Sequence, residues 1–90
     1  MSAETDILEV EQMMKDIEEY VGENVWNPDR NSKAVKEIAE SDLMLENLMT
    51  GHIMGMDVLS SEQVKQVLNL GKRLEKAKCG LPSPPCSRLN

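Results

Sequence analysis

The chain contains no phenylalanine, and its aromatic residues are limited to Tyr20 and Trp26, which make up 2% of the sequence. Its apolar side chains are instead Leu, Ile, Val, Ala and seven Met. Most of these suit helices better than strands, so a β-sandwich or barrel is not expected. No stretch approaches the roughly 18 apolar residues of a membrane span, and no basic segment followed by an apolar run marks the N-terminus. We expect no membrane association and a cytoplasmic location, or the host cytoplasm for a viral protein.

Residues that commonly carry chemistry are also scarce. The chain has one histidine, His52, and two cysteines, Cys79 and Cys86, which we interpret as reduced thiols. A structural zinc site usually takes four ligands, often as cysteine pairs two to four residues apart, whereas six residues separate these two cysteines. We therefore expect no metal site, no cofactor and no enzymatic activity.

Charge is distributed unevenly along the chain, whose net charge is −6. Residues 1–23 carry eight acidic side chains and one basic one, whereas residues 60–90 carry six basic and two acidic ones. The simplest interpretation is that a basic third helix lies against an acidic first helix, in the same chain or in a second copy. Direct nucleic-acid binding is not expected, because the chain is acidic and has few stacking aromatics.

Hydrophobic periodicity predicts a first helix over residues 4–22. Apolar side chains recur there at alternating spacings of three and four, which places them on one face of a helix. These residues, which we also consider for self-association, are Ile7, Val10, Met14, Ile17 and Val21.

A second helix is expected over residues 32–50, after a loop in which Pro28 starts at most one helical turn. Its inward side chains are expected to be Val35, Ile38, Ala39, Leu45, Leu48 and Met49. The sequence leaves open whether Gly51 and Gly55 interrupt this helix.

The third helix is expected over residues 60–79, because Ser60 and Gln63 have the spacing of a capping box. Its inward side chains are expected to be Val64, Val67, Leu68, Leu70 and Leu74. Gly80 and the prolines that follow should end it. The fold class is thus all-α: a three-helix bundle, or a helical hairpin that self-associates, formed by a single domain over residues 1–79 with a flexible, disordered Pro-rich tail over 80–90.

The composition favours a non-enzymatic regulator or adaptor that binds another protein. Methionine side chains adapt to irregular surfaces, so a Met-rich apolar face with an acidic rim is the expected binding surface. Trp26 either fills the end of the bundle or anchors a partner. The residues considered for partner binding are Met44, Met54, Met56, Trp26, Glu11, Glu18 and Glu19.

Two other functions remain open. The acidic first helix could imitate nucleic-acid phosphates, as in a phage- or plasmid-type inhibitor of a nucleic-acid-binding protein or enzyme. Alternatively, copies of the chain could form a homodimer or a higher homo-oligomer that sequesters a ligand or serves a structural role.

Overall fold

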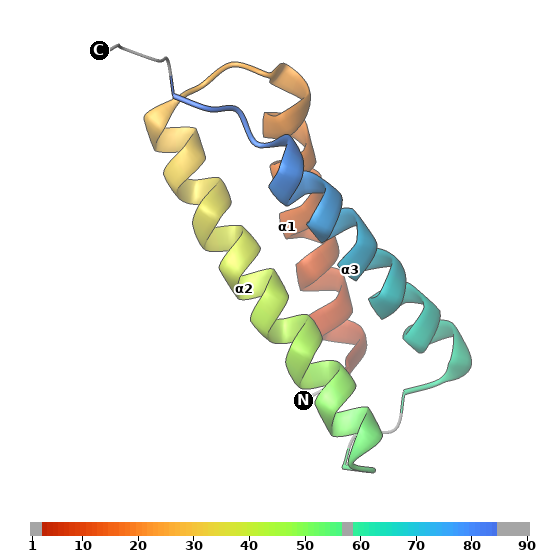
Figure 1. Ribbon diagram of the computed structural model, residues 1–90. Helices are drawn as coiled ribbons and strands as arrows, with labels where there is room; N and C mark the ends of the chain where they lie inside the picture. Colours follow the sequence, from red (N-terminus) through yellow and green to blue (C-terminus); the bar gives the residue numbers. More distant parts are fainter. Residues whose placement is uncertain (1–2, 57–58, 85–90) are drawn as a thin grey trace.

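The computed structural model describes residues 3–56 and 59–84, and within them it contains three α-helices and no strand (Figure 1). Helix α1 spans Ala3–Glu23, α2 spans Pro28–Ile53 and α3 spans Ser61–Gly80. The chain runs up, down and up, so α2 is antiparallel to both of its neighbours. The bundle measures 53 × 21 × 19 Å. The all-α class and the three helices are confirmed, whereas self-association is not tested by a single chain.

The second helix begins four residues before its predicted start. Asn27 has extended backbone angles, and its side chain accepts a hydrogen bond from the Arg30 amide at 3.0 Å. Pro28 occupies the first helical position, where a missing amide hydrogen costs nothing. The turn at Pro28 therefore continues directly into α2, and the expectation of a loop up to residue 31 was wrong.

The other end of α2 answers the question about the two glycines. Gly51 lies inside the helix, whereas Gly55 follows its end with a φ of +75°. Helix α3 begins as predicted, because Ser60 accepts from the Gln63 amide at 3.1 Å and Gln63 accepts from the Ser60 amide at 3.0 Å.

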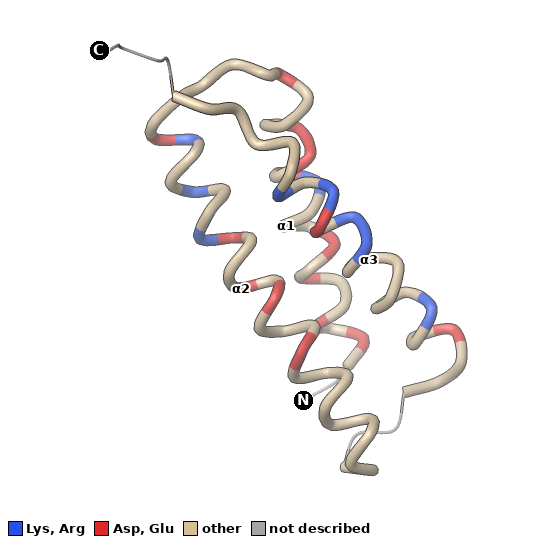
Figure 2. Tube along the Cα trace, in the orientation of Figure 1, with Lys and Arg blue, Asp and Glu red and all other residues tan. Residues whose placement is uncertain are grey.

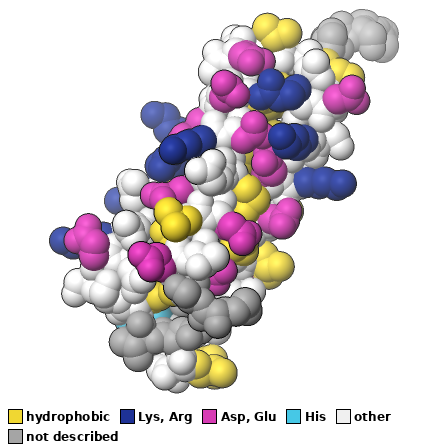
Figure 3. All heavy atoms as spheres, turned by 180° about the vertical axis from the view of Figure 1, so that it is seen from behind, with side chains coloured by type: hydrophobic (Ala, Val, Ile, Leu, Met, Phe, Trp, Pro, Cys, Tyr) yellow, Lys and Arg dark blue, Asp and Glu magenta, His cyan; other side chains and the backbone are white. Residues whose placement is uncertain are grey.

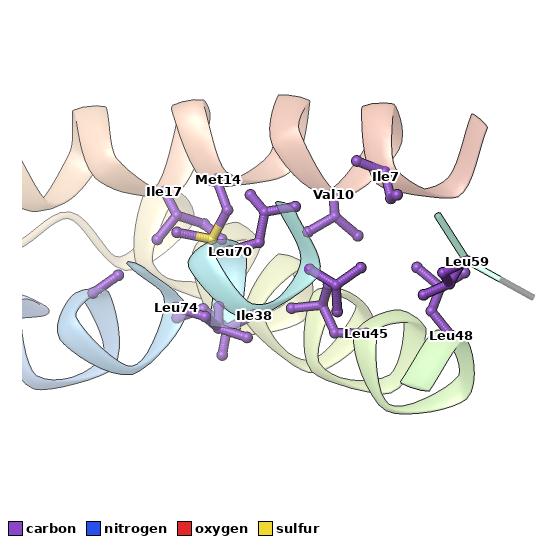
Figure 4. Packing of buried hydrophobic residues seen from close by; sticks show 12 residues of the cluster. Ile7, Val10, Met14, Ile17, Ile38, Leu45, Leu48, Leu59, Leu70 and Leu74 are labelled. Carbon is purple, nitrogen blue, oxygen red and sulfur yellow. The ribbon is translucent and has the colours of Figure 1, made fainter. Parts of the chain in front are cut away.

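The core is a row of apolar side chains along the bundle axis, and Figure 4 shows α1 side chains directed at those of α2 and α3. Met14 and Ile17 are fully buried, and Leu70 and Leu74 are 1% exposed. Burying a Leu or Ile side chain stabilises a fold by about 1.5–3 kcal/mol. The buried cluster comprises Ile7, Val10, Met14, Ile17, Ile38, Leu45, Leu48, Leu59, Val67, Leu70, Leu74 and Ala77.

The predicted inward face of α2 was correct at Ile38, Leu45 and Leu48 and wrong at Val35 and Ala39. Val35 and Ala39 are exposed, and their places toward the core are taken by Ala34 and Ser41. The observed buried positions are Ala34, Ile38, Ser41, Leu45 and Leu48, which alternate at four and three residues. Ser41 gave no hydrophobic signal in the sequence, and Ala34 gave no stronger signal than Ala39, although small side chains fit a close helix–helix contact.

Two further predictions were wrong in part: the inward side chains of α3, and a disordered tail that begins directly after this helix. Leu68 is 52% exposed instead of inward, while Ala77 is buried. After α3, Leu81 packs on the core and Pro82 is buried, so these two residues lie on the bundle. The predicted tail otherwise falls largely on residues 85–90, which lie outside the described residues.

Candidate protein-binding surfaces

A groove runs between α2 and α3 on the side of the bundle away from α1. It has a volume of about 490 Å³. We call it the α2–α3 groove. Its apolar part consists of Leu45, Met49, Val67, Leu68 and Gly71, and its charged part of Asp42, Glu46, Lys72 and Glu75.

The charged side chains of the groove fall into a paired and an unpaired group. Lys78 on α3 lies 3.8 Å from Asp42 on α2 and 3.2 Å from Glu75, so one ammonium group serves both carboxylates. Glu46 and Lys72 take part in no salt bridge among the described residues. One acid on α2 and one base on α3 thus remain available to a molecule that fills the groove.

Gly71 is the one groove residue without a side chain. A glycine within a helix destabilises it by about 1 kcal/mol relative to alanine. A Cβ atom placed on Gly71 would meet nothing within 4 Å, so the packing of this chain does not require glycine there. The position instead leaves space on the α3 side of the groove.

A second surface lies at the turn after α2. The large apolar side chains Ile53, Met54 and Met56 are 76%, 66% and 76% exposed. Together with Gly55 they form residues 53–56, which we call the apolar turn. Met54 and Met56 were among the residues considered for partner binding, and the structure places both at the same end of the bundle.

The apolar turn has a defined backbone conformation. The Met56 amide donates to the Gly51 carbonyl at 2.9 Å, and the Gly55 amide donates to the His52 carbonyl at 3.1 Å. With Gly55 in the left-handed region, these two bonds form a Schellman motif. In such motifs the residue at the position of Met56 commonly makes an apolar contact with the residue at the position of Gly51. Glycine offers no side chain for that contact, and Met56 remains exposed.

His52 fixes the chain on the far side of the turn. Its Nδ1 atom accepts a hydrogen bond from the Leu59 amide at 3.0 Å. Leu59 is 4% exposed and belongs to the core, so this bond ties the start of the third helical segment to the end of α2. The only histidine of the chain therefore has a structural contact, which the sequence gave no means to predict.

The acidic residues considered on α1 do not form one free surface. Glu18 is held by Arg73, and Glu11 is half-buried whereas Glu19 is exposed. Asp16 lies 3.5 Å from Lys33, and Glu23 lies 3.5 Å from Arg30. Figure 2 shows acidic residues along α1 and the second half of α2, and Figure 3 shows that from behind they are interspersed with basic and apolar side chains.

Two carboxyl groups meet between α1 and α2. Burial, a hydrogen bond to Asp16 and the negative charge of Asp16 raise the pKa of Glu37 to about 7. The same hydrogen bond, donated by Glu37, is the main reason that the pKa of Asp16 is lowered, and Lys33 lowers it further. Protonated Glu37 beside ionised Asp16 is thus the favoured state in weakly acidic solution, below pH 7.

The remaining residues considered for binding lie apart from one another. Trp26 is half-buried in the connection between α1 and α2, at the opposite end of the bundle from the apolar turn (Figure 1). Met44 is half-buried and packs on the core. The residues considered for self-association are inside one chain: Ile7, Val10, Met14 and Ile17 are at most 3% exposed, and Val21 is half-buried against them. They contact α2 and α3, and a second copy has no access to them in the closed bundle.

In residues 3–56 and 59–84, no group of three or more His, Cys, Asp or Glu side chains is arranged to hold a metal ion. Within the same residues, no helix is long and apolar enough to cross a membrane. Comparison with known proteins gave no matching family model, no matching curated protein and no matching solved structure.

Proposed function

We propose that this chain is a non-enzymatic regulator or adaptor that binds another protein, and that the apolar turn is its anchor for that partner. The observation that carries the proposal is the exposure of Ile53, Met54 and Met56, between 66% and 76%, within four consecutive residues. Single exposed apolar residues are common on proteins, but a contiguous group is typical of interaction sites. Methionine suits such a site because its flexible thioether adapts to the shape of a partner.

The fixed backbone of the turn supports this function. Binding loses affinity when a loop must be ordered, and a preformed loop avoids that cost. Here the Schellman bonds hold the turn on the side of α2, and the bond between Leu59 and His52 holds Leu59 at the end of α2. The turn therefore presents its side chains without needing the partner to shape it.

The experiment compares proteins captured by the wild-type chain with those captured by a double variant, Met54→Ser with Met56→Ser. Because both side chains are largely exposed, the variant should remain folded, which circular dichroism would verify. A matched control carries Leu8→Ser and Val25→Ser, which remove exposed apolar side chains, 56% and 64% exposed, from outside the turn.

Quantitative mass spectrometry of the captured proteins then gives a clear result. We expect a small set of proteins that the wild type and the control retain and the turn variant loses. If all three chains capture the same set in the same amounts, the apolar turn is not the anchor and the proposal fails.

Electrostatics favour this function over an imitation of nucleic acid. Three acidic side chains of α1, Asp16, Glu18 and Glu23, already have basic partners within the chain. Such pairs weaken the negative field that a phosphate-binding groove would recognise. Binding that falls steeply with added salt and is displaced by DNA would reverse this preference.

A further inference from the structure

We propose that the α2–α3 groove is a self-association surface that pairs two copies of this chain around a two-fold axis parallel to the helices. This surface is separate from the apolar turn. The proposal rests on the two unpaired charges of the groove, the open space at Gly71 and the size of the face.

The first argument concerns the positions of Glu46 and Lys72. The contact between Lys78 and Asp42 sets α2 and α3 at a common level. From there Glu46 lies four residues on along α2, about 6 Å, and Lys72 lies six residues back along α3, about 9 Å, at 1.5 Å per residue. Because the helices are antiparallel, both steps run toward the same end of the bundle. Glu46 and Lys72 therefore lie on opposite sides of the groove at nearly the same level.

This arrangement is self-complementary in one orientation. A two-fold axis parallel to the helices, lying in the docking face, places α2 of each copy over α3 of the other. Glu46 of one copy then faces Lys72 of the second copy, and the same pair forms again on the other side of the axis, as an isologous interface requires. An axis across the helices would instead place α2 over α2, where Glu46 and Asp42 would meet like charges.

Lys78 reduces the repulsion between the other acids of the groove. Asp42 and Glu75 of each copy share Lys78, so each copy brings one compensating charge for two carboxylates to that level. Leu68, which is half-exposed, lies on the same stripe of α3 as Lys72 and Glu75 and adds apolar surface beside these charges.

Gly71 and the size of the face supply the second argument. The absence of a side chain at Gly71 lets a facing helix approach α3 closely, which gives a reason for a residue that this chain's own packing does not need. A standard interface buries about 800 Å² on each partner. The α2–α3 side of a molecule that extends 53 × 21 × 19 Å has room for that area.

The test measures mass in solution by sedimentation equilibrium at low salt over a range of chain concentrations. We expect a dimer of twice the 10.1 kDa chain mass. Glu46→Lys alone and Lys72→Glu alone should each weaken the dimer by about tenfold or more, because each creates two repulsive pairs. Mixing these two variants in equal amounts should restore the dimer, since every facing pair is again opposite in charge.

Two further variants separate this arrangement from others. With the axis parallel to the helices, the double variant Glu46→Lys with Lys72→Glu should dimerise like the wild type. With the axis across the helices, Glu46→Lys alone should instead strengthen the dimer, because a base at position 46 would face Asp42 of the second copy. A Cβ atom at Gly71 meets nothing within 4 Å, and the groove beside it has room for a longer side chain, so Gly71→Leu should give a folded monomer. Glu40→Lys and Lys15→Glu, which change charges outside the groove, are the matched controls and should leave the dimer unchanged.

A wild-type chain that is monomeric at every concentration would overturn the proposal. So would a dimer that survives Gly71→Leu and both single charge reversals. Neither result would bear on the apolar turn, because none of these variants changes residues 53–56.

Discussion

Arg73 on α3 donates two hydrogen bonds to the carboxylate of Glu18 on α1, from Nε at 3.0 Å and from Nη2 at 2.6 Å. This contact joins the basic third helix to the acidic first helix. The charge distribution of the sequence left open whether the two helices pair within one chain or between two copies, and this contact lies within one chain. Hydrogen bonds from Arg73 are the main reason that the pKa of Glu18 lies below its ordinary value. The charge asymmetry of the sequence therefore has a direct structural counterpart.

Replacing Arg73 by alanine should reduce the free energy of unfolding by roughly 0.5–1 kcal/mol at low salt, because the pair is partly exposed to solvent. The loss should shrink as salt is added. Urea unfolding at two salt concentrations measures both effects. Exchanging the partners, with Glu18→Arg and Arg73→Glu together, should recover part of the loss, and no recovery would show that the contact is not what stabilises this region.

The same pair should also make stability depend on pH. A carboxyl group with a lowered folded-state pKa contributes stability above its unfolded pKa of about 4.5 and loses it as the pH falls further. The stability difference between wild type and Arg73→Ala should therefore narrow in acid. Unfolding curves recorded from neutral pH down to about pH 3 test this, and a constant difference would contradict it.

His52→Ala should reduce stability by about 1–2 kcal/mol, because it removes the acceptor of the Leu59 amide near the core. Asparagine is the matched control, since its side-chain oxygen can occupy the place of Nδ1 and its helix propensity is similar to that of histidine. Hydrogen exchange at the Leu59 amide gives the local readout. Faster exchange in His52→Ala than in His52→Asn is expected, and equal exchange would mean that the bond contributes little.

Tyr20→Phe should reduce stability by about 1 kcal/mol, although Tyr20 is only 1% exposed and phenylalanine fills nearly the same space. The hydroxyl donates to Asn31 Oδ1 at 3.1 Å and accepts from the Asn27 amide at 3.4 Å, so it connects the end of α1 to the start of α2. Thermal unfolding measures the effect. In a chain that already carries Asn31→Ala, Tyr20→Phe should reduce stability by less. An equal reduction in both backgrounds would exclude coupling between the Tyr20 and Asn31 side chains.

The three helices could be predicted because their signals are local. The spacing from Ile7 to Ile17 in α1 and the capping box of Ser60 and Gln63 depend only on nearby residues. The burial of α2 could not be read in the same way. Ser41 is buried where its hydroxyl lies 3.7 Å from the Met13 sulfur of α1, a contact that its own hydrophobicity does not indicate. Ala34 has the same side chain as the exposed Ala39, so only the packing of the helices distinguishes the two.

The binding surfaces were predictable only in part. Met54 and Met56 were selected for their chemistry, and the structure shows that both are exposed on one turn. The α2–α3 groove was not predicted, because Asp42 and Lys72 lie far apart in sequence and a groove depends on how two helices are placed. Gly71 carried the one available signal, a glycine inside a strongly helical segment, and its significance depends on the open space beside it.

The free energy of unfolding of the wild type should fall as the pH rises, and Glu37→Gln should prevent this fall. The pKa of Glu37 is raised to about 7, first by burial and then by Asp16. A carboxyl group of this kind contributes its full stability below its unfolded pKa of about 4.5, and the contribution is lost as the pH rises through the folded value. Glutamine can still donate a hydrogen bond to Asp16 and never ionises.

The variant and the wild type should therefore be nearly equal in stability at about pH 5, and the variant should be more stable by about 1–2 kcal/mol at pH 8. This estimate is reduced from the full shift because Glu37 is only half-buried and water screens the repulsion. Chemical unfolding at both pH values gives the comparison. Glu19→Gln removes a carboxylate from an exposed position of α1 that does not contribute to the raised pKa of Glu37, and it should keep the wild-type pH dependence. Parallel stability curves for Glu37→Gln and wild type would show instead that Glu37 is ionised beside Asp16 throughout this range.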